Sequence, residues 1–301
     1  MNRRFWAALV ALTFLASSAG AQTDRRRGMQ PAQRYYYSPS APAAADPEFD
    51  DVGFNLVFWL KGDAGTYQTT DCSTTAAVDG QTVKCWADQS GSAFNVSEND
   101  TNVARVAGGT QGLTKSFVNN RASGTGKLTL SSASALTLDF GTADSRTMFF
   151  RGSVENPTNT NYIIDKTGTG GNVGWDFDIR TNGAGAGKVV YYLGDVGGDY
   201  NGVSYGPVDS STAYEVWVTY NGIANGFTMR FNRASVTPTD HSSGTVNTST
   251  SDGVLCIAGR ANGSDADQIY IEEIAVFSRV LTGAEMIAFE TGYLTDRYGA
   301  M

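Results

Sequence analysis

The sequence predicts an all-β fold, an antiparallel β-sandwich with one C-terminal helix. Short apolar or alternating runs recur from Phe54 onward and are separated by clusters of Gly, Asn, Asp and Ser. Alternation at period two marks strands with one buried face. No long helical pattern lies between these runs, so neighbouring strands are expected to pair antiparallel. The expected strands are residues 54–60, 147–154, 162–165, 175–180, 188–193, 214–220, 227–231, 254–258 and 269–277.

The run 282–299 predicts the helix. Thr282 and Glu285 have the spacing of a capping box, in which a hydroxyl and a carboxylate each satisfy one of the helix's first backbone amides. Apolar residues follow at helical spacing from Met286 to Tyr293, and Gly299 ends the run. We expect a helix of about four turns that packs its apolar stripe against the sandwich.

The first 21 residues have the pattern of a signal peptide. Arg3 and Arg4 precede an apolar run at 5–16, and Ala19-Gly20-Ala21 matches a cleavage site. The run is shorter than the about 20 residues that a membrane span needs. Residues 22–50 are rich in Pro and Ala and lack apolar periodicity, which predicts a disordered linker. Residues 51–301 are expected to form the sandwich domain. The protein is therefore expected to be secreted, periplasmic or on the cell surface, with no membrane span once the leader is removed.

Charge argues against one class of partner. The formal net charge is −8, and it becomes −10 once a leader containing Arg3 and Arg4 is removed. Nucleic-acid binding depends on neutralising phosphates with Lys and Arg, so a nucleic-acid partner is not expected.

Three cysteines are present. Cys72 and Cys85 flank a short glycine-containing loop, and an exported chain meets oxidising conditions, so we expect them to form a disulfide. Cys256 lies in an apolar run and is expected to be a buried free thiol.

Four segments carry a family resemblance. Residues 58–65 read FWLKGDAG, residues 83–91 read VKCWADQSG, residues 271–282 read IEEIAVFSRVLT, and residues 293–299 read YLTDRYG. In this order they resemble the opening strand, the following segment, the closing strand and the terminal helix of laminin-G-like (LamG) domains, which belong to the concanavalin A-like superfamily. The resemblance implies a jelly-roll sandwich over nearly all of residues 54–299. It does not imply one function, because this fold hosts lectins, adhesion modules, enzymes and passive domains.

No catalytic constellation is found in the sequence. Hydrolases of this superfamily carry Glu-x-Asp-x-x-Glu, which is absent, and Glu272 and Glu273 are adjacent and should point to opposite faces of a strand. The related lyases use a catalytic His, but the single histidine, His241, lies in a polar loop. We expect a non-enzyme and rank a polysaccharide hydrolase or lyase third among the functions.

The outward positions of three strands offer material for binding a saccharide. The resemblance implies that a saccharide would lie on the concave face of one sheet, where an aromatic ring stacks on sugar C–H groups and polar side chains bond the hydroxyls. An alternative places Trp217 under the helix or at the second sheet, with the charged residues merely solvating a surface. The loop residues Asp195, Asp199, Tyr200 and Tyr205 are a second candidate. The predicted ligand-binding residues are Trp217, Glu215, Asp176, Asp178, Arg180 and Arg230.

The only cofactor expected is a structural calcium ion. Many members of the superfamily hold calcium with an aspartate at the position that matches Glu272, and Asp265 and Asp267 are acidic neighbours that would add ligands.

Two functional classes remain open. The first is a carbohydrate-binding or adhesion module that recognises a polysaccharide or glycoconjugate and has Trp217 exposed beside Asp176 and Arg180. The second is a structural or assembly subunit of a cell surface, matrix or filament. It would have a buried Trp217, and protein partners or self-association through an edge strand or the linker.

Overall fold

The structure is a computed structural model in which the chain divides into two units, Met1–Ala45 and Asp46–Met301. It describes residues 54–301 apart from 74–75, 99–102, 121–125, 131–137, 139, 142, 156–159, 168–173, 181–186, 195–197, 224, 245, 247–252 and 261–267. The signal peptide predicted at 1–21 and the linker predicted at 22–50 lie outside the described residues and stay predictions.

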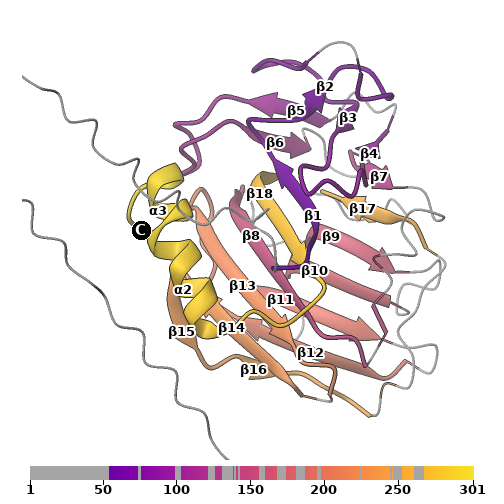
Figure 1. The fold of residues 1–301 in the computed structure, drawn as a ribbon, viewed down its shortest axis with the longest axis vertical. Helices are drawn as coiled ribbons and strands as arrows, with labels where there is room; N and C mark the ends of the chain where they lie inside the picture. Colours follow the sequence, from indigo (N-terminus) through magenta and orange to yellow (C-terminus); the bar gives the residue numbers. More distant parts are fainter. Residues whose placement is uncertain are drawn as a thin grey trace, which may run out of the picture. The chain divides into compact units, whose positions relative to one another are not determined.

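Two antiparallel sheets form the sandwich (Figure 1), as the sequence predicts. The eight-stranded sheet has the order β15-β14-β13-β8-β18-β6-β5, with β1 also paired to β18. Its strands are β1 (Leu56–Lys61), β5 (Val103–Val106), β6 (Phe117–Asn120), β8 (Arg146–Val154), β13 (Tyr214–Tyr220), β14 (Phe227–Phe231), β15 (Ala234–Val236) and β18 (Ile269–Phe277).

The ten-stranded sheet has the order β16-β12-β11-β10-β9-β17-β7-β4-β3-β2. Its strands are β2 (Thr66–Tyr67), β3 (Cys85–Trp86), β4 (Val96–Ser97), β7 (Leu128–Leu130), β9 (Asn161–Thr167), β10 (Gly174–Arg180), β11 (Lys188–Gly194), β12 (Tyr200–Tyr205), β16 (Thr239–Asp240) and β17 (Leu255–Ile257).

The main core fills the space between the sheets. Alternating residues of each strand enter it, as Trp175, Phe177 and Ile179 do from β10. Burying one such side chain stabilises the fold by about 2 kcal/mol, and the buried set runs along both sheets. The inward-facing residues are therefore those that the alternation in the sequence predicts.

The C-terminal helix begins as predicted. In α2 (Gly283–Thr291) the Thr282 hydroxyl accepts from the Glu285 amide, and the Glu285 carboxylate accepts from the Thr282 amide. The run then divides, because Gly292 adopts φ −91° and ψ −99° and separates α2 from α3 (Tyr293–Tyr298). Glycine is a poor helix-interior residue, so the single four-turn helix becomes two. Neither is long and apolar enough to cross a membrane, and the same holds for the rest of the described chain.

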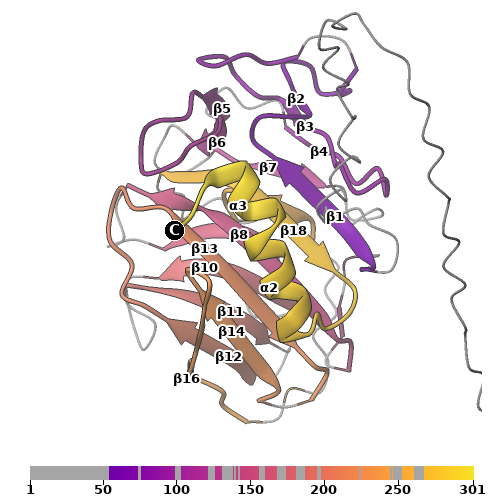
Figure 2. The ribbon, with the colours of Figure 1, turned by 60° about the vertical axis from the view of Figure 1, so that its left-hand side comes forward.

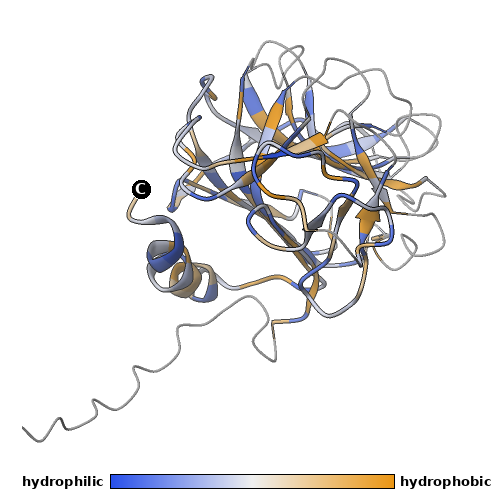
Figure 3. Cartoon of the chain, turned by 90° about the horizontal axis from the view of Figure 1, so that it is seen from above, coloured by the Kyte–Doolittle hydropathy of each residue, from blue (hydrophilic) through white to orange (hydrophobic). Residues whose placement is uncertain are grey.

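Both helices cover the outer face of the eight-stranded sheet (Figures 2 and 3). A second core lies between the helices and this sheet. It is built from outward-facing side chains of β1, β8, β13 and β18 and from apolar helix residues. The eight-stranded sheet is thus buried on both faces. The second core contains Trp59, Phe149, Trp217, Ala275, Phe277, Leu281, Met286, Phe289, Tyr293, Leu294 and Tyr298.

The cysteines lie as predicted. Cys72 and Cys85 form a disulfide with their Cα atoms 5.3 Å apart, and Cys256 is a buried free thiol. Burial, together with the charge of Asp165, raises the pKa of the Cys256 thiol to about 12, so the thiol is protonated and inert at neutral pH.

Candidate functional site

The six predicted ligand-binding residues do not form one cluster. Asp176, Asp178 and Arg180 belong to β10 of the ten-stranded sheet. Trp217 and Glu215 belong to β13, and Arg230 to β14, of the eight-stranded sheet. Alternation distinguishes inward from outward residues, but it does not say to which sheet a strand belongs. The predicted neighbourhood of Trp217 with Asp176 and Arg180 is therefore wrong.

Trp217 is fully buried, so the expectation that it is exposed is wrong as well. Its ring lies 4.6 Å from that of Phe149, 6.1 Å from Phe289 of α2 and 6.3 Å from Phe277. The prediction that Trp217 points away from the main core was right, but α2 covers this position on the outer face. Trp217 cannot meet a saccharide in this conformation.

Glu215 and Arg230 are buried in ion pairs on the same face. Glu215 accepts from Arg151 at 2.7 Å and from Arg233 at 2.6 Å. Arg230 pairs with Glu290 of α2 and also donates to Ser235. The Arg230–Glu290 pair connects α2 to β14, and the Arg233–Glu215 pair connects the β14–β15 turn to β13. Neither Glu215 nor Arg230 faces solvent.

Glu272 does not fit a calcium ligand in this arrangement. One carboxylate oxygen accepts from Arg151 at 2.6 Å, and the other accepts from the backbone amides of Thr114 and Lys115. A guanidinium and two amides thus take the positions around the carboxylate from which a cation would bind it. Asp265 and Asp267 lie outside the described residues, and calcium there stays a prediction.

Glu273 lies on the same face as Glu272, which corrects the expectation of opposite faces. A register shift between Ile271 and Glu273 in the pairing of β18 with β8 adds one residue, as in a β-bulge. Glu273 accepts from Trp59 Nε1 at 2.6 Å and from the Tyr293 hydroxyl at 2.7 Å. Burial raises its pKa, although Arg297 and these donors oppose the effect.

The outer face of the ten-stranded sheet carries three buried carboxylates. Asp176 and Asp178 share this face of β10, and Asp165 of β9 lies directly opposite Asp176. All three are at most 3% exposed, so the expectation that Asp176 and Asp178 are solvent-facing is wrong. Arg180 ends β10, but its side chain is not among those described.

Next to these carboxylates lies a partly exposed aromatic pair. Tyr192 of β11 is the cross-strand partner of Asp176 on one side and of Gly202 on the other. Tyr192 and Tyr200 stack with their ring centroids 4.5 Å apart and an interplanar angle of 23°, and both are partly exposed. A Cβ at residue 202 would lie 2.9 Å from the Tyr192 ring, so glycine there allows the ring to lie over β12.

Polar groups border the pair on β12 and β16. The His241 ring lies 2.5 Å from the Ser204 hydroxyl, and its amide donates to Gly202 O. Asp240 is exposed, and hydrogen bonds from the Ser242 hydroxyl and amide lower its pKa, so it is a carboxylate at neutral pH. We call the surface formed by Tyr192, Tyr200 and His241 the tyrosine face. Ser204, which the His241 ring contacts, is buried, and Asp240 pairs with the inward-facing Val203, so it lies at the sheet edge with the opposite parity.

The tyrosine face overlaps the second predicted cluster only at Tyr200. Tyr205 instead packs against Phe231, with the ring centroids 5.2 Å apart, Asp199 is partly exposed beside Tyr200, and Asp195 lies outside the described residues. The missed residue is Tyr192. The Tyr191-Tyr192 doublet within a strand was its signal, because one of two adjacent strand residues must face outward.

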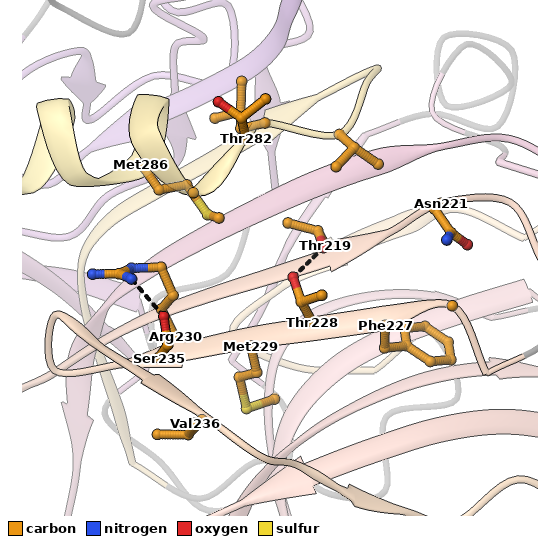
Figure 4. Close-up of a pocket in the computed structure, with 14 residues that line it drawn as sticks. Thr219, Asn221, Phe227, Thr228, Met229, Arg230, Ser235, Val236, Thr282 and Met286 are labelled. Atoms are coloured by element: carbon orange, nitrogen blue, oxygen red, sulfur yellow. Dashed lines mark hydrogen bonds between the residues drawn. The ribbon is translucent and has the colours of Figure 1, made fainter.

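A groove of about 590 Å³ lies on the opposite side of the sandwich, beside the first turn of α2. Thr219 and Thr228 share a hydrogen bond on its sheet side, and Met286 projects from the helix above them (Figure 4). Arg230 lines one end, but its nitrogens donate to Glu290, Ser235 and Arg233 O. The groove is therefore mainly apolar, and its polar lining consists of the hydroxyls of Thr219, Thr228, Ser235 and Thr282 and the side chains of Asn221 and Arg230.

No family model matches the sequence, and no curated protein matches it. Solved structures do match. The binding domain of Paraclostridial Mosquitocidal Protein 1 is 15% identical with a TM-score of 0.53, and the match covers 82% of this chain and 53% of that chain. A tryptophan-to-alanine mutant of HCR/D is 16% identical with a TM-score of 0.51, over 80% of this chain and 52% of that chain.

This chain thus spans about half the length of these solved structures. At this identity the likeness shows the fold alone, and it agrees with the all-β sandwich. The resemblance to laminin-G-like domains stays a prediction.

Proposed function

We propose that this protein is a non-catalytic binding module that recognises a saccharide through the tyrosine face. The observation that carries the proposal is the stacked Tyr192–Tyr200 pair, partly exposed on the outer face of a sheet. An aromatic ring offers a flat apolar surface to sugar C–H groups, while neighbouring polar groups bond the hydroxyls. The matching structure named a binding domain adds support at the level of the fold.

Charge narrows the ligand class to neutral saccharides. Asp176 lies beside Tyr192, and Asp165 lies opposite Asp176 on the same face; both carboxylates are buried. These buried carboxylates repel uronate and sulfate groups, whereas a neutral saccharide meets no such repulsion.

The test is affinity gel electrophoresis of the purified protein in neutral and in anionic soluble polysaccharides. We expect a neutral glycan to retard the protein, and Tyr192→Ala to weaken binding at least tenfold, or about 1.4 kcal/mol. Gly202→Ala should weaken it as well, because the added methyl pushes the Tyr192 ring off β12. Tyr67→Ala, which removes a partly exposed tyrosine of β2, is the matched control and should bind normally.

Retardation that is unchanged in Tyr192→Ala and Gly202→Ala would remove the tyrosine face from the proposal. No retardation by any glycan would reject saccharide binding altogether.

An assembly subunit is the second candidate. The observation that favours it is the burial of Trp217, which this alternative requires. The exposed edge strands β15 and β16 supply unpaired backbone groups for self-association. Sedimentation velocity over a hundredfold concentration range tests it: concentration-dependent oligomers support assembly, and a monomer throughout rejects self-assembly.

A further inference from the structure

Arg146 is a buried cation that takes part in no ion pair within the described chain. It opens β8 and shares the inward parity of Met148 and Phe150, so its side chain enters the space between the sheets. Only 1% of its surface is exposed. Burying a guanidinium away from water is costly unless its charge and its donors are satisfied.

The hydrogen bonds of Arg146 are incomplete. Its Nε donates to the Tyr191 hydroxyl at 2.6 Å. Nη1 and Nη2, which carry four of its five N–H groups, donate to no acceptor among the described residues. Unsatisfied buried donors of this kind are rare in folded proteins and need an explanation, such as an ordered water or ion.

Aromatic rings surround the guanidinium. Its central carbon lies 4.9 Å from the centroid of Tyr220, 5.0 Å from Phe140 and 5.7 Å from Tyr191. Ring faces attract a cation, which accounts for part of its stability between the sheets. They accept no strong hydrogen bond in the plane of the guanidinium, so the Nη donors still lack partners.

A bound anion accounts for both features at once. A water molecule would satisfy donors but leave the buried positive charge uncompensated, whereas an anion does both. Asp176 raises the pKa of Tyr191 and is therefore near it, but the side chain of Asp176 lies on the outer face of β10. We infer that Nη1 and Nη2 of Arg146 form a buried site for a small inorganic anion of the chloride class.

The direct test is a bromide soak of crystals of the unsubstituted protein. Bromide replaces chloride and scatters anomalously. We expect an anomalous peak in contact with Nη1 and Nη2 of Arg146. The absence of a peak there, with or without ordered water in its place, overturns the inference.

Thermal unfolding gives a second readout in solution. Titration with sodium chloride should raise Tm along a saturating curve, by about 3 °C at tenfold the apparent Kd. Sodium gluconate at the same ionic strength should not, because gluconate is too large to enter. Arg146→Met should abolish the difference between the two salts. Arg105→Met, which removes a largely surface arginine paired with Asp79, should keep it. Equal Tm values in chloride and gluconate for the unsubstituted protein overturn the inference, whether or not Arg146→Met folds.

Discussion

The two sheets differ in what lies on their outer faces. On the eight-stranded sheet, Trp217 points outward, yet α2 covers it completely. On the ten-stranded sheet, Tyr192 points outward and remains partly exposed beside Tyr200. Both residues occupy outward positions of alternating strands, so the local pattern is the same. The difference arises from the helices, which have one apolar stripe and can cover only one sheet.

Charged residues differ between the faces in the same way. Arg151 lies under α3, with its guanidinium 4.3 Å from the Tyr298 ring and bonded to Glu215 and Glu272. Asp240 of the other sheet is exposed and bonds only its neighbour Ser242 among the contacts described. The helix-covered face therefore depends on its charges for stability, whereas the ten-stranded sheet carries a solvent-exposed carboxylate at its β16 edge.

The strongest test of this contrast is Arg151→Ala. Removing the guanidinium leaves Glu215 and Glu272 as buried carboxylates that have lost a partner, and we expect a loss of about 4 kcal/mol in the free energy of unfolding. Urea denaturation measures it. Arg105→Ala, at a more exposed ion pair, should cost less than about 1 kcal/mol. Similar losses in the two variants would contradict the structural role of the covered face.

The next test compares alanine substitutions of the two outward-facing aromatic residues. Trp217→Ala opens a cavity in the second core and should cost about 3–4 kcal/mol, without changing saccharide affinity at temperatures where the protein is folded. Tyr192→Ala should cost less than about 1.5 kcal/mol, because its ring is partly exposed, but should weaken saccharide binding. Paired urea titrations and affinity gels separate the effects. Loss of saccharide binding in fully folded Trp217→Ala would contradict the contrast between the two outer faces.

The disulfide lies at the opposite end of the ten-stranded sheet from the tyrosine face. Cys85 is in β3, next to the terminal strand β2, whereas Tyr192 and Tyr200 lie on β11 and β12. Replacing both Cys72 and Cys85 with Ala should cost about 3 kcal/mol, from the freedom regained by the unfolded chain. Thermal unfolding measures it, and saccharide affinity measured alongside should be unchanged. A loss of affinity would mean that the two ends of the sheet are coupled.

The smallest expected effect concerns the start of α2. Hydrogen bonds from Arg279 and Thr282 lower the pKa of Glu285 from 4.5 to about 2. Since the folded pKa is below the unfolded one, the stabilisation is present above about pH 4.5 and is lost as the pH falls towards 2. The pair is about a quarter exposed, so the effect should be about 1 kcal/mol. Urea midpoints at pH 6 and 2.5 should differ by less in Glu285→Gln than in the unsubstituted protein; equal differences would show that the cap contributes nothing.

Local patterns in the sequence predict much of the fold. Alternation at period two places Trp175, Phe177 and Ile179 in the core, and the spacing of Thr282 and Glu285 predicts the capping box. These features depend on residues a few positions apart. The division of the helix at Gly292 and the bulge before Glu273 are also local, but they depend on backbone geometry that residue types leave open.

The candidate site was harder to predict because it depends on which strands share a sheet. Asp176 and Trp217 have the same outward parity, but their strands belong to different sheets. Tyr192 becomes a binding candidate only because Gly202 and Tyr200 of β12 pair beside it. Pairings of this kind join residues distant in sequence, and only the assembled sheets specify them.

The position of β18 has a consequence for how the chain folds. No described strand follows it in the sequence, yet it pairs with β1, β6 and β8 in the interior of its sheet. The Trp59–Glu273 hydrogen bond closes a separation of 214 residues. Until residue 277 has been synthesised, β1 and β6 lack the strand that joins them to β8, and the helices have no complete surface to cover. Folding dominated by such distant pairings is slow, so we expect the eight-stranded sheet to be completed only after its C-terminal strand is available.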